Sequence, residues 1–294
     1  MHIIRTHIIY FLCFLGLAQA QTSTIKISLD WVLNPHHAPL VIAIEKGFFK
    51  ESGLSVELIG SVGSLEGCKQ VGAGNIDFAM IVEPQWIIQA SRGLVLKPVC
   101  TFIPKPLEVF VSRVPLSQLK GKRIGHSSSG AGFSASVLKE ILAQQNIDLD
   151  EVELVYTRQA LVGSFISGQV DAVTNIYRTY GLQDIRNHIH DFYVYPLEDW
   201  GIPAFAATIF VSKPEMDPKI VQKLMTALKK SCLFLKDHPK ESWEIFRKYK
   251  PELDTENNAQ VWRDIVNLFD IKDVDTKGPH YQALRAFLEK HELI

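Results

Sequence analysis

Polar and aromatic side chains suited to recognising a small molecule gather directly after the first predicted strand. Residues 30–40 carry an indole, two imidazoles, an amide and a carboxylate, among them Asp30, Trp31, Asn34 and His37. In open α/β sheets, ligands bind beyond the carboxyl ends of the strands. A ring-shaped ligand needs a flat aromatic face and a few directed polar groups. The cluster therefore predicts one wall of a ligand site, with a buried tryptophan beside a helix-capping asparagine as the alternative.

Catalytic and metal-binding chemistry finds little support in the sequence. His36 and His37 are adjacent, but such spacing rarely aims both rings at one ion, and no third ligand lies nearby. The chain contains no G-x-S-x-G or H-E-x-x-H motif and no cysteine near a plausible histidine base. We therefore expect no catalytic residue, no metal and no cofactor.

Two loops rich in serine and glycine each precede a predicted helix, at residues 60–64 and 127–132. Backbone N–H groups in such turns can hold an anion or a carbonyl oxygen, and serine hydroxyls add hydrogen bonds. The candidate contacts there are Ser61, Ser64, Ser127, Ser128, Ser129 and Gly130. Neither loop has P-loop or G-x-G-x-x-G spacing, so a nucleotide is not indicated. Helix capping alone is the competing interpretation.

Five further candidates follow other predicted strands. Glu83 comes after the third strand, and Asn175 and Tyr177 come after the corresponding strand in the second half of the chain. Trp200 and Phe205 border the segment that leads back from there. Each offers a polar group or a stacking face to a ligand, although the two aromatic rings could instead pack the connection between domains.

Strands alternate with helices through the first 175 residues, which indicates βα units and a mostly parallel sheet. Predicted strands cover residues 25–29, 54–59, 76–81, 123–125, 152–155 and 170–175, and predicted helices cover residues 38–46, 65–73, 86–92, 134–145 and 161–167. Residues 72–79 and 165–172 also echo each other, each passing from a helix through glycine to an aspartate and a strand. We infer two lobes built on one plan.

The last third of the chain differs. A strand at 207–212 precedes four predicted helices, at 220–234, 240–249, 257–269 and 280–290. This order fits a chain that re-enters the first lobe, so we assign residues 21–108 and 206–294 to lobe 1 and residues 109–205 to lobe 2. The crossings are expected near 109–111 and 204–205, with strands acting as the hinge.

The N-terminus and the composition indicate an exported protein. Residues 1–20 combine Arg5, a short apolar run and an A-x-A pattern, as in a cleaved secretory signal, and the run is too short for a membrane span. The remaining 30 basic and 32 acidic residues nearly balance, which argues against nucleic acid as a partner. Cys68, Cys100 and Cys232 are widely spaced, so we expect buried thiols, with one disulfide left open. We expect a periplasmic monomer.

These features together resemble the type II periplasmic solute-binding proteins, closest to the group that binds thiamine pyrimidine precursors and sulfonates or taurine. The resemblance covers nearly all of the mature chain. The matching segments are Asp30-Trp31 with Asn34 and His37, Lys46-Gly47-Phe48-Phe49, Gly74-x-x-Asp77-Phe78, Lys120-Gly121-Lys122-Arg123, Gly168-x-Val170-Asp171 and Gly201-Ile202-Pro203. The resemblance implies an α/β fold of two lobes that close on a small ligand and deliver it to the permease of an ATP-driven importer.

The resemblance also exposes departures. Pyrimidine binders of this kind usually have carboxylates at places that correspond to Gly181, Ala206 and Ala207. A thiamine pyrimidine precursor is the first expectation for the ligand, and a sulfonate or another small molecule is the alternative. Related fungal enzymes make the pyrimidine from a vitamin B6 cofactor and carry a cysteine-rich segment where this chain has residues 204–208. An enzyme of that type is the competing class.

The expected mechanism is hinge closure. An open form exposes Trp31 and the loops of lobe 1, and the 127–130 loop and Tyr177 close over the docked ligand. Each lobe completes its contacts only when shut, so the ligand shifts the population to the closed form.

Overall fold

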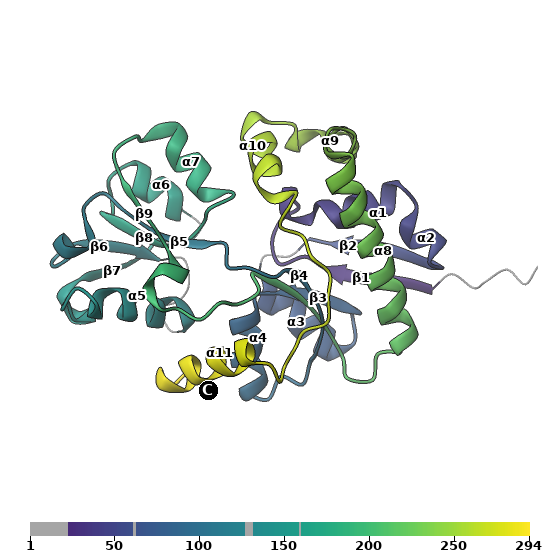
Figure 1. Cartoon of the computed structure of the whole chain (residues 1–294), viewed down its shortest axis with the longest axis horizontal. Coiled ribbons are helices and arrows are strands. Elements are labelled where there is room, and N and C mark those ends of the chain that lie inside the picture. Colours follow the sequence, from purple (N-terminus) through teal and green to yellow (C-terminus); the bar gives the residue numbers. More distant parts are fainter. Residues whose placement is uncertain (1–22, 61–62, 127–131, 159) are drawn as a thin grey trace, which may run out of the picture.

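The computed structural model describes residues 23–60, 63–126, 132–158 and 160–294. The predicted signal at 1–20 lies outside these residues. Figure 1 shows two α/β bodies side by side, each built around one sheet with helices on its faces. This arrangement confirms the predicted fold class. Within the described residues, no helix combines the length and the apolar character that crossing a bilayer requires.

Both sheets have five strands in the same spatial plan. The first has the order β2-β1-β3-β10-β4, and the second has the order β7-β6-β8-β5-β9. In the first sheet the strands are β1 (Ser23–Ser28), β2 (Leu54–Ile59), β3 (Phe78–Ile81), β4 (Lys97–Ile103) and β10 (Thr208–Ser212). In the second they are β5 (Glu108–Ser112), β6 (Arg123–His126), β7 (Glu153–Tyr156), β8 (Ala172–Tyr177) and β9 (Tyr193–Pro196). β10 and β5 run antiparallel to their neighbours, and the other pairs are parallel.

The helices connect these strands or follow the last one. In the first body they are α1 (Ala38–Glu45), α2 (Phe48–Glu51), α3 (Ser64–Ala73) and α4 (Glu83–Ser91), and in the second α5 (Phe133–Ala143), α6 (Leu161–Ile166) and α7 (Gly181–His188). The C-terminal helices are α8 (Pro218–Asp237), α9 (Pro239–Tyr249), α10 (Glu256–Ile265) and α11 (Pro279–Lys290). α1 packs on α8 and α9, and its residues 38–43 are all buried, which explains why its sequence is apolar on every side.

The sequence echo has a physical basis. Asp77 accepts a hydrogen bond from the backbone N–H of Lys26 in β1 at 2.8 Å, and Asp171 accepts one from Arg123 in β6 at 2.9 Å. In each case a glycine three residues earlier ends the preceding helix at positive φ, 81° at Gly74 and 76° at Gly168, a conformation that favours glycine. Each aspartate, one residue before β3 or β8, thus binds the neighbouring strand β1 or β6, so both bodies repeat the same local arrangement.

The connections between the bodies differ from the expected crossings. The chain leaves the first sheet after β4 and enters the second at β5, so residues 104–107 form the first connection. This connection lies a few residues before the crossing expected near 109–111, because residues 109–111 lie inside β5 and pair with β8 and β9. The return runs through 201–207, and both connections are irregular rather than strands. The lobe boundaries and their action as a hinge remain predictions.

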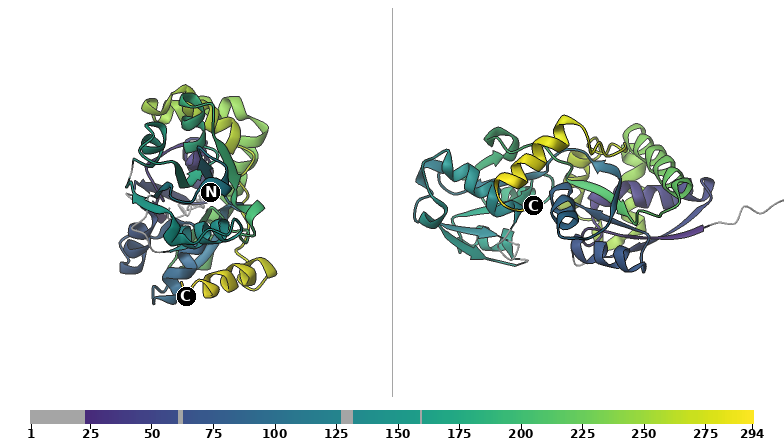
Figure 2. Two further views of the ribbon diagram at one scale, coloured as in Figure 1. Left: turned by 90° about the vertical axis from the view of Figure 1, so that its left-hand side faces the viewer. Right: turned by 90° about the horizontal axis from the view of Figure 1, so that it is seen from below.

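α11 joins the two bodies along one side (Figure 2). At its start Tyr281 packs on Trp86 of α4, with the ring centroids 6.1 Å apart. Near its end Phe287 packs on Phe133 of α5 at 5.8 Å, and Lys290 forms an ion pair with Glu140. One hydrophobic cluster therefore extends through α4, α5 and α11.

Candidate functional site

The first wall of the candidate site is the turn between β1 and α1. His37 Nε2 lies 2.8 Å from Asp30 Oδ1, and the backbone N–H of Asn34 donates to His37 Nδ1 at 3.2 Å. Because Nδ1 accepts, Nε2 carries the proton and donates to the carboxylate. Burial would raise the pKa of Asp30, but the hydrogen bond from His37 and the nearby imidazoles outweigh burial and lower it. Asp30 and His37 therefore stabilise each other.

Asn34 and Trp31 differ in role within this turn. The side-chain oxygen of Asn34 accepts from the backbone N–H of His36 at 2.8 Å and caps the short 3-10 helix Pro35–His37. The capping alternative thus describes Asn34. Trp31 is 40% exposed, so the alternative of a buried core tryptophan was wrong, and its indole is free to meet a ligand.

His36 makes one of the contacts between the two bodies. Its Nε2 lies 2.7 Å from Oγ1 of Thr179, and its ring lies 5.6 Å from the ring of Tyr177 and 6.5 Å from that of Tyr180. Burial lowers the pKa of His36 to about 4, so the imidazole is neutral at pH 7. The structure thus brings the turn after β1 against the end of β8 and the residues that follow it. The ligand contact expected of Tyr177 remains a prediction.

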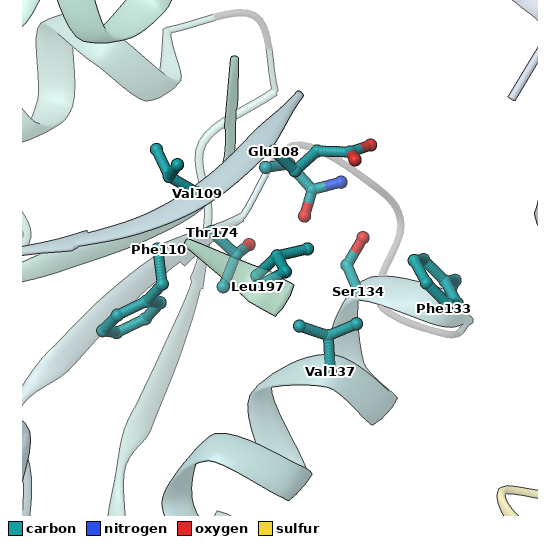
Figure 3. A pocket seen from close by; sticks show the side chains of 9 residues that line it. Glu108, Val109, Phe110, Phe133, Ser134, Val137, Thr174 and Leu197 are labelled. Atoms are coloured by element: carbon teal, nitrogen blue, oxygen red, sulfur yellow. The ribbon is translucent and has the colours of Figure 1, made fainter. Parts of the chain in front are cut away.

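A small pocket with a cavity volume of about 10 Å³ opens in the second body. Its lining comes from three places: the start of β5, the end of β8 and the first turns of α5 (Figure 3). The lining residues are Glu108, Val109, Phe110, Phe133, Ser134, Val137, Thr174, Asn175 and Leu197. The pocket is apolar along most of its surface, with a few polar groups, which is the usual character of a small-molecule site.

Glu108 is the site residue that the sequence argument missed. It is 6% exposed, and burial raises the pKa of its carboxyl to about 7. Its Oε2 atom has no hydrogen-bond partner among the described residues, and neither does Oγ1 of Thr174. A single carboxylate in the apolar strand 108–112 was the available signal, because a buried charge without a partner is costly.

The other sequence candidates lie in several surroundings. Glu83 is buried and engaged, since it accepts from the backbone N–H of Ala206 at 2.7 Å and lies 3.0 Å from Nε2 of His280. The Ser64 hydroxyl donates to Gln85 at 2.9 Å. Phe205 is fully buried against Phe133.

Three positions complete this account. Trp200 packs on Tyr195 at 5.8 Å. Asn175 lines the pocket. Ser61 and the candidates Ser127, Ser128, Ser129 and Gly130 lie outside the described residues. Within the described ranges, no cluster of three or more His, Cys, Asp or Glu side chains is arranged to hold a metal ion.

The carboxylates expected from the resemblance have no room where they were expected. A Cβ atom at Gly181 would lie 3.2 Å from Val162 and 3.4 Å from Ile176. Ala206 and Ala207 are buried at 2% and 0% exposure. A larger acidic side chain at these positions would have to displace packed neighbours.

Comparisons with known proteins agree with this architecture. A Haemophilus influenzae protein named for thiamine biosynthesis is 33% identical, over 99% of this chain and 95% of its own length. The formylaminopyrimidine-binding protein of Halalkalibacterium halodurans is 23% identical, over 91% and 86%. The 4-amino-5-hydroxymethyl-2-methylpyrimidine phosphate synthase of Candida albicans is 21% identical, over 82% and 76%.

Among solved structures, the periplasmic aliphatic sulphonate binding protein of Escherichia coli superposes with a TM-score of 0.71 at 15% identity, covering 92% of this chain and 88% of that one. At that identity the likeness shows the fold. The family model for NMT1/THI5-like proteins matches residues 34–242. The chain therefore belongs to the NMT1/THI5-like family.

Proposed function

We propose that this chain is an exported solute-binding protein that closes on a pyrimidine-type thiamine precursor and delivers it to a membrane importer. The observation that carries the proposal is the joint site. The turn with Trp31 and His36 contacts Tyr177 and Thr179. The neighbouring pocket is lined by a carboxyl and a hydroxyl oxygen that have no hydrogen-bond partner among the described residues. The names of two relatives, one for thiamine biosynthesis and one for formylaminopyrimidine binding, support this ligand class.

The binding function is favoured over synthesis by the pocket itself. A B6-dependent enzyme needs a lysine to hold its cofactor, and the residues that line the pocket include none. Residues 204–208 form the return connection and the start of β10, with Phe205, Ala206 and Ala207 buried. A non-enzymatic protein with an importer permease as its partner accounts for these features.

The test is isothermal titration calorimetry on the mature chain, residues 21–294. The probes are 4-amino-5-hydroxymethyl-2-methylpyrimidine, its N-formyl-aminomethyl analogue and taurine. We expect a Kd of about 1 μM or tighter for a pyrimidine, which corresponds to a binding free energy of about −8 kcal/mol. We expect no heat of binding for taurine. Binding of taurine alone would replace the ligand class, and a stable imine with pyridoxal phosphate would support the enzyme.

Export and oligomeric state have separate tests. Mass spectrometry of the protein from a periplasmic extract should show a chain that begins at Gln21, because the A-x-A pattern ends at Ala20. Light scattering should show a monomer. A chain retaining residues 1–20, or a stable dimer, would contradict these expectations.

A further inference from the structure

Two buried oxygen atoms in the pocket wall have no partner within the described part of the chain. They are Oε2 of Glu108 and Oγ1 of Thr174, at exposed fractions of 6% and 5% for their residues. Leaving a buried polar atom unpaired costs about 1–3 kcal/mol, and more for a charged group. Figure 3 shows both side chains among the sticks that surround the pocket. Both residues line the pocket, so this cost is placed at its wall.

The backbone beside these atoms is arranged for the pocket rather than for regular pairing. Asn175, next to Thr174 in β8, has φ at 59°, a left-handed conformation that costs a non-glycine residue energy and clusters at functional sites. The pairing of β5 with β8 is irregular between Val109 and Val111. Asn175 also lines the pocket, so the irregular strand brings polar atoms from two adjacent residues to one cavity.

The charges around the pocket restrict what can bind. Arg178 follows β8, and its guanidinium is hydrogen-bonded to Glu198 at 2.8 Å. The residues that line the pocket include one carboxyl group and no cationic side chain. A sulfonate or phosphate placed here would meet the Glu108 carboxyl, and like charges in an apolar site repel. The charge of Arg178 acts on this carboxyl, but its guanidinium is already hydrogen-bonded to Glu198.

We propose that Glu108, together with Thr174, recognises the edge of a ligand ring that carries an exocyclic amino group beside a ring nitrogen. This inference rests on the proposed function and names the part of the ligand that the site selects. The amino group donates a hydrogen bond to one carboxyl oxygen. The second carboxyl oxygen and the ring nitrogen share one proton, which is bound to either of these two atoms. The Thr174 hydroxyl supplies a further hydrogen bond.

The proton requirement matches the environment of Glu108. Burial raises the pKa of its carboxyl to about 7, so the group can hold or release a proton near neutral pH. The pair of carboxyl and aminopyrimidine therefore forms with one shared proton and no net change in charge at the site. A ring without the amino group loses the first hydrogen bond and leaves a carboxyl oxygen unpaired.

The experiment is a double-mutant cycle between protein and ligand, read by calorimetry. The protein variants are Glu108→Leu and Thr174→Val, with Glu153→Leu on the exposed strand β7 as a matched substitution. Leucine is used because a glutamine amide could still accept from the amino group and donate to the ring nitrogen. The ligands are 4-amino-5-hydroxymethyl-2-methylpyrimidine and the same ring without the amino group. We expect Glu108→Leu to weaken the amino ligand by about 30-fold and the other ring by less than about 3-fold, since a hydrogen bond to an ionisable group contributes about 2 kcal/mol. Glu153→Leu should change neither.

The outcomes separate the two proposals. Equal losses for both rings, or no loss for either, overturn the role of Glu108 while leaving pyrimidine binding intact. If the wild-type protein binds neither ring, the proposed function fails as well. If Glu108→Leu does not fold, as judged by circular dichroism, Thr174→Val carries the same comparison. The expected loss for the amino ligand is then about 5-fold, because one neutral hydrogen bond contributes about 1 kcal/mol.

Discussion

The pH dependence of folding stability offers a test of the electrostatics at the site, because two buried groups should act in opposite directions. Burial lowers the pKa of His36 to about 4 from an ordinary value of 6.5 and raises the pKa of Glu108 to about 7 from 4.5. His36 faces His37 and Asp30, and Glu108 faces Arg178. The wild-type protein conceals both effects, since they oppose each other.

The signs follow from proton linkage. The depressed pKa of His36 means that the unfolded chain binds the proton first, so stability is lost as pH falls from about 6.5 towards 4. The raised pKa of Glu108 means that its contribution is fully present below 4.5 and is lost as pH rises through 7. Between pH of about 7.5 and 4.5, the wild-type protein should lose about 2–3 kcal/mol through His36 and gain a similar amount through Glu108.

Urea unfolding of His36→Gln and Glu108→Gln at both pH values separates these contributions. The free energy of unfolding of the wild-type protein, relative to His36→Gln, should fall by about 2–3 kcal/mol on acidification. Relative to Glu108→Gln it should rise by a similar amount. Taking differences cancels the carboxylates elsewhere in the chain. A difference that stays constant with pH for either variant would refute the burial assigned to that side chain.

Three other predictions test separate parts of the structure. Trp31→Ala should weaken pyrimidine binding more than about tenfold yet lower Tm by less than about 2 °C, because the indole is 40% exposed; equal loss of both would mark it as core. Gly67→Ala should lower the free energy of unfolding, measured in urea, by about 1–3 kcal/mol, because the new Cβ would lie 2.4 Å from Ser28 Oγ. Gly72→Ala in the same helix is the control. Its Cβ meets nothing closer than 3.4 Å, so this variant should be neutral or stabilising. The three buried free thiols should react with a disulfide reagent only in denaturant, and rapid labelling of the native protein would contradict their burial.

The sequence predicted those elements whose patterns are local. β2 has the predicted bounds, and the helix starts and ends of α1 and α11 are within one residue. The sequence did not predict β4, because this segment contains Pro98 and no alternation of apolar and polar residues. Both features suit an edge strand that borders only β10. β9 has four residues, most of them half-buried, so neither its length nor its periodicity stood out.

The site was only partly predictable, because residue types do not reveal which polar groups already have partners. Asp30 and His37 looked like ligand contacts, but they are hydrogen-bonded to each other. Glu83 likewise holds Ala206 and His280. His36 was passed over in favour of its neighbour, although it alone of the two reaches Thr179. Pairing depends on side-chain direction, which only the folded chain defines.

The sequence analysis missed Glu108 as a candidate site residue because of the strand topology. The search followed the carboxyl ends of parallel strands, where ligands are expected, but Glu108 begins its strand. Because β5 runs antiparallel to β8, Glu108 pairs with Tyr177 at the end of β8, and the start of β5 lies at the ligand edge. The first sheet has the same plan with β10 as its antiparallel strand, and Ala206 and Ala207 immediately precede it. Those are two of the three positions where the resemblance led us to expect acidic residues. In the second sheet the antiparallel strand itself begins with an acidic residue, Glu108, so this chain has a carboxyl at the start of β5 where it has none at the start of β10.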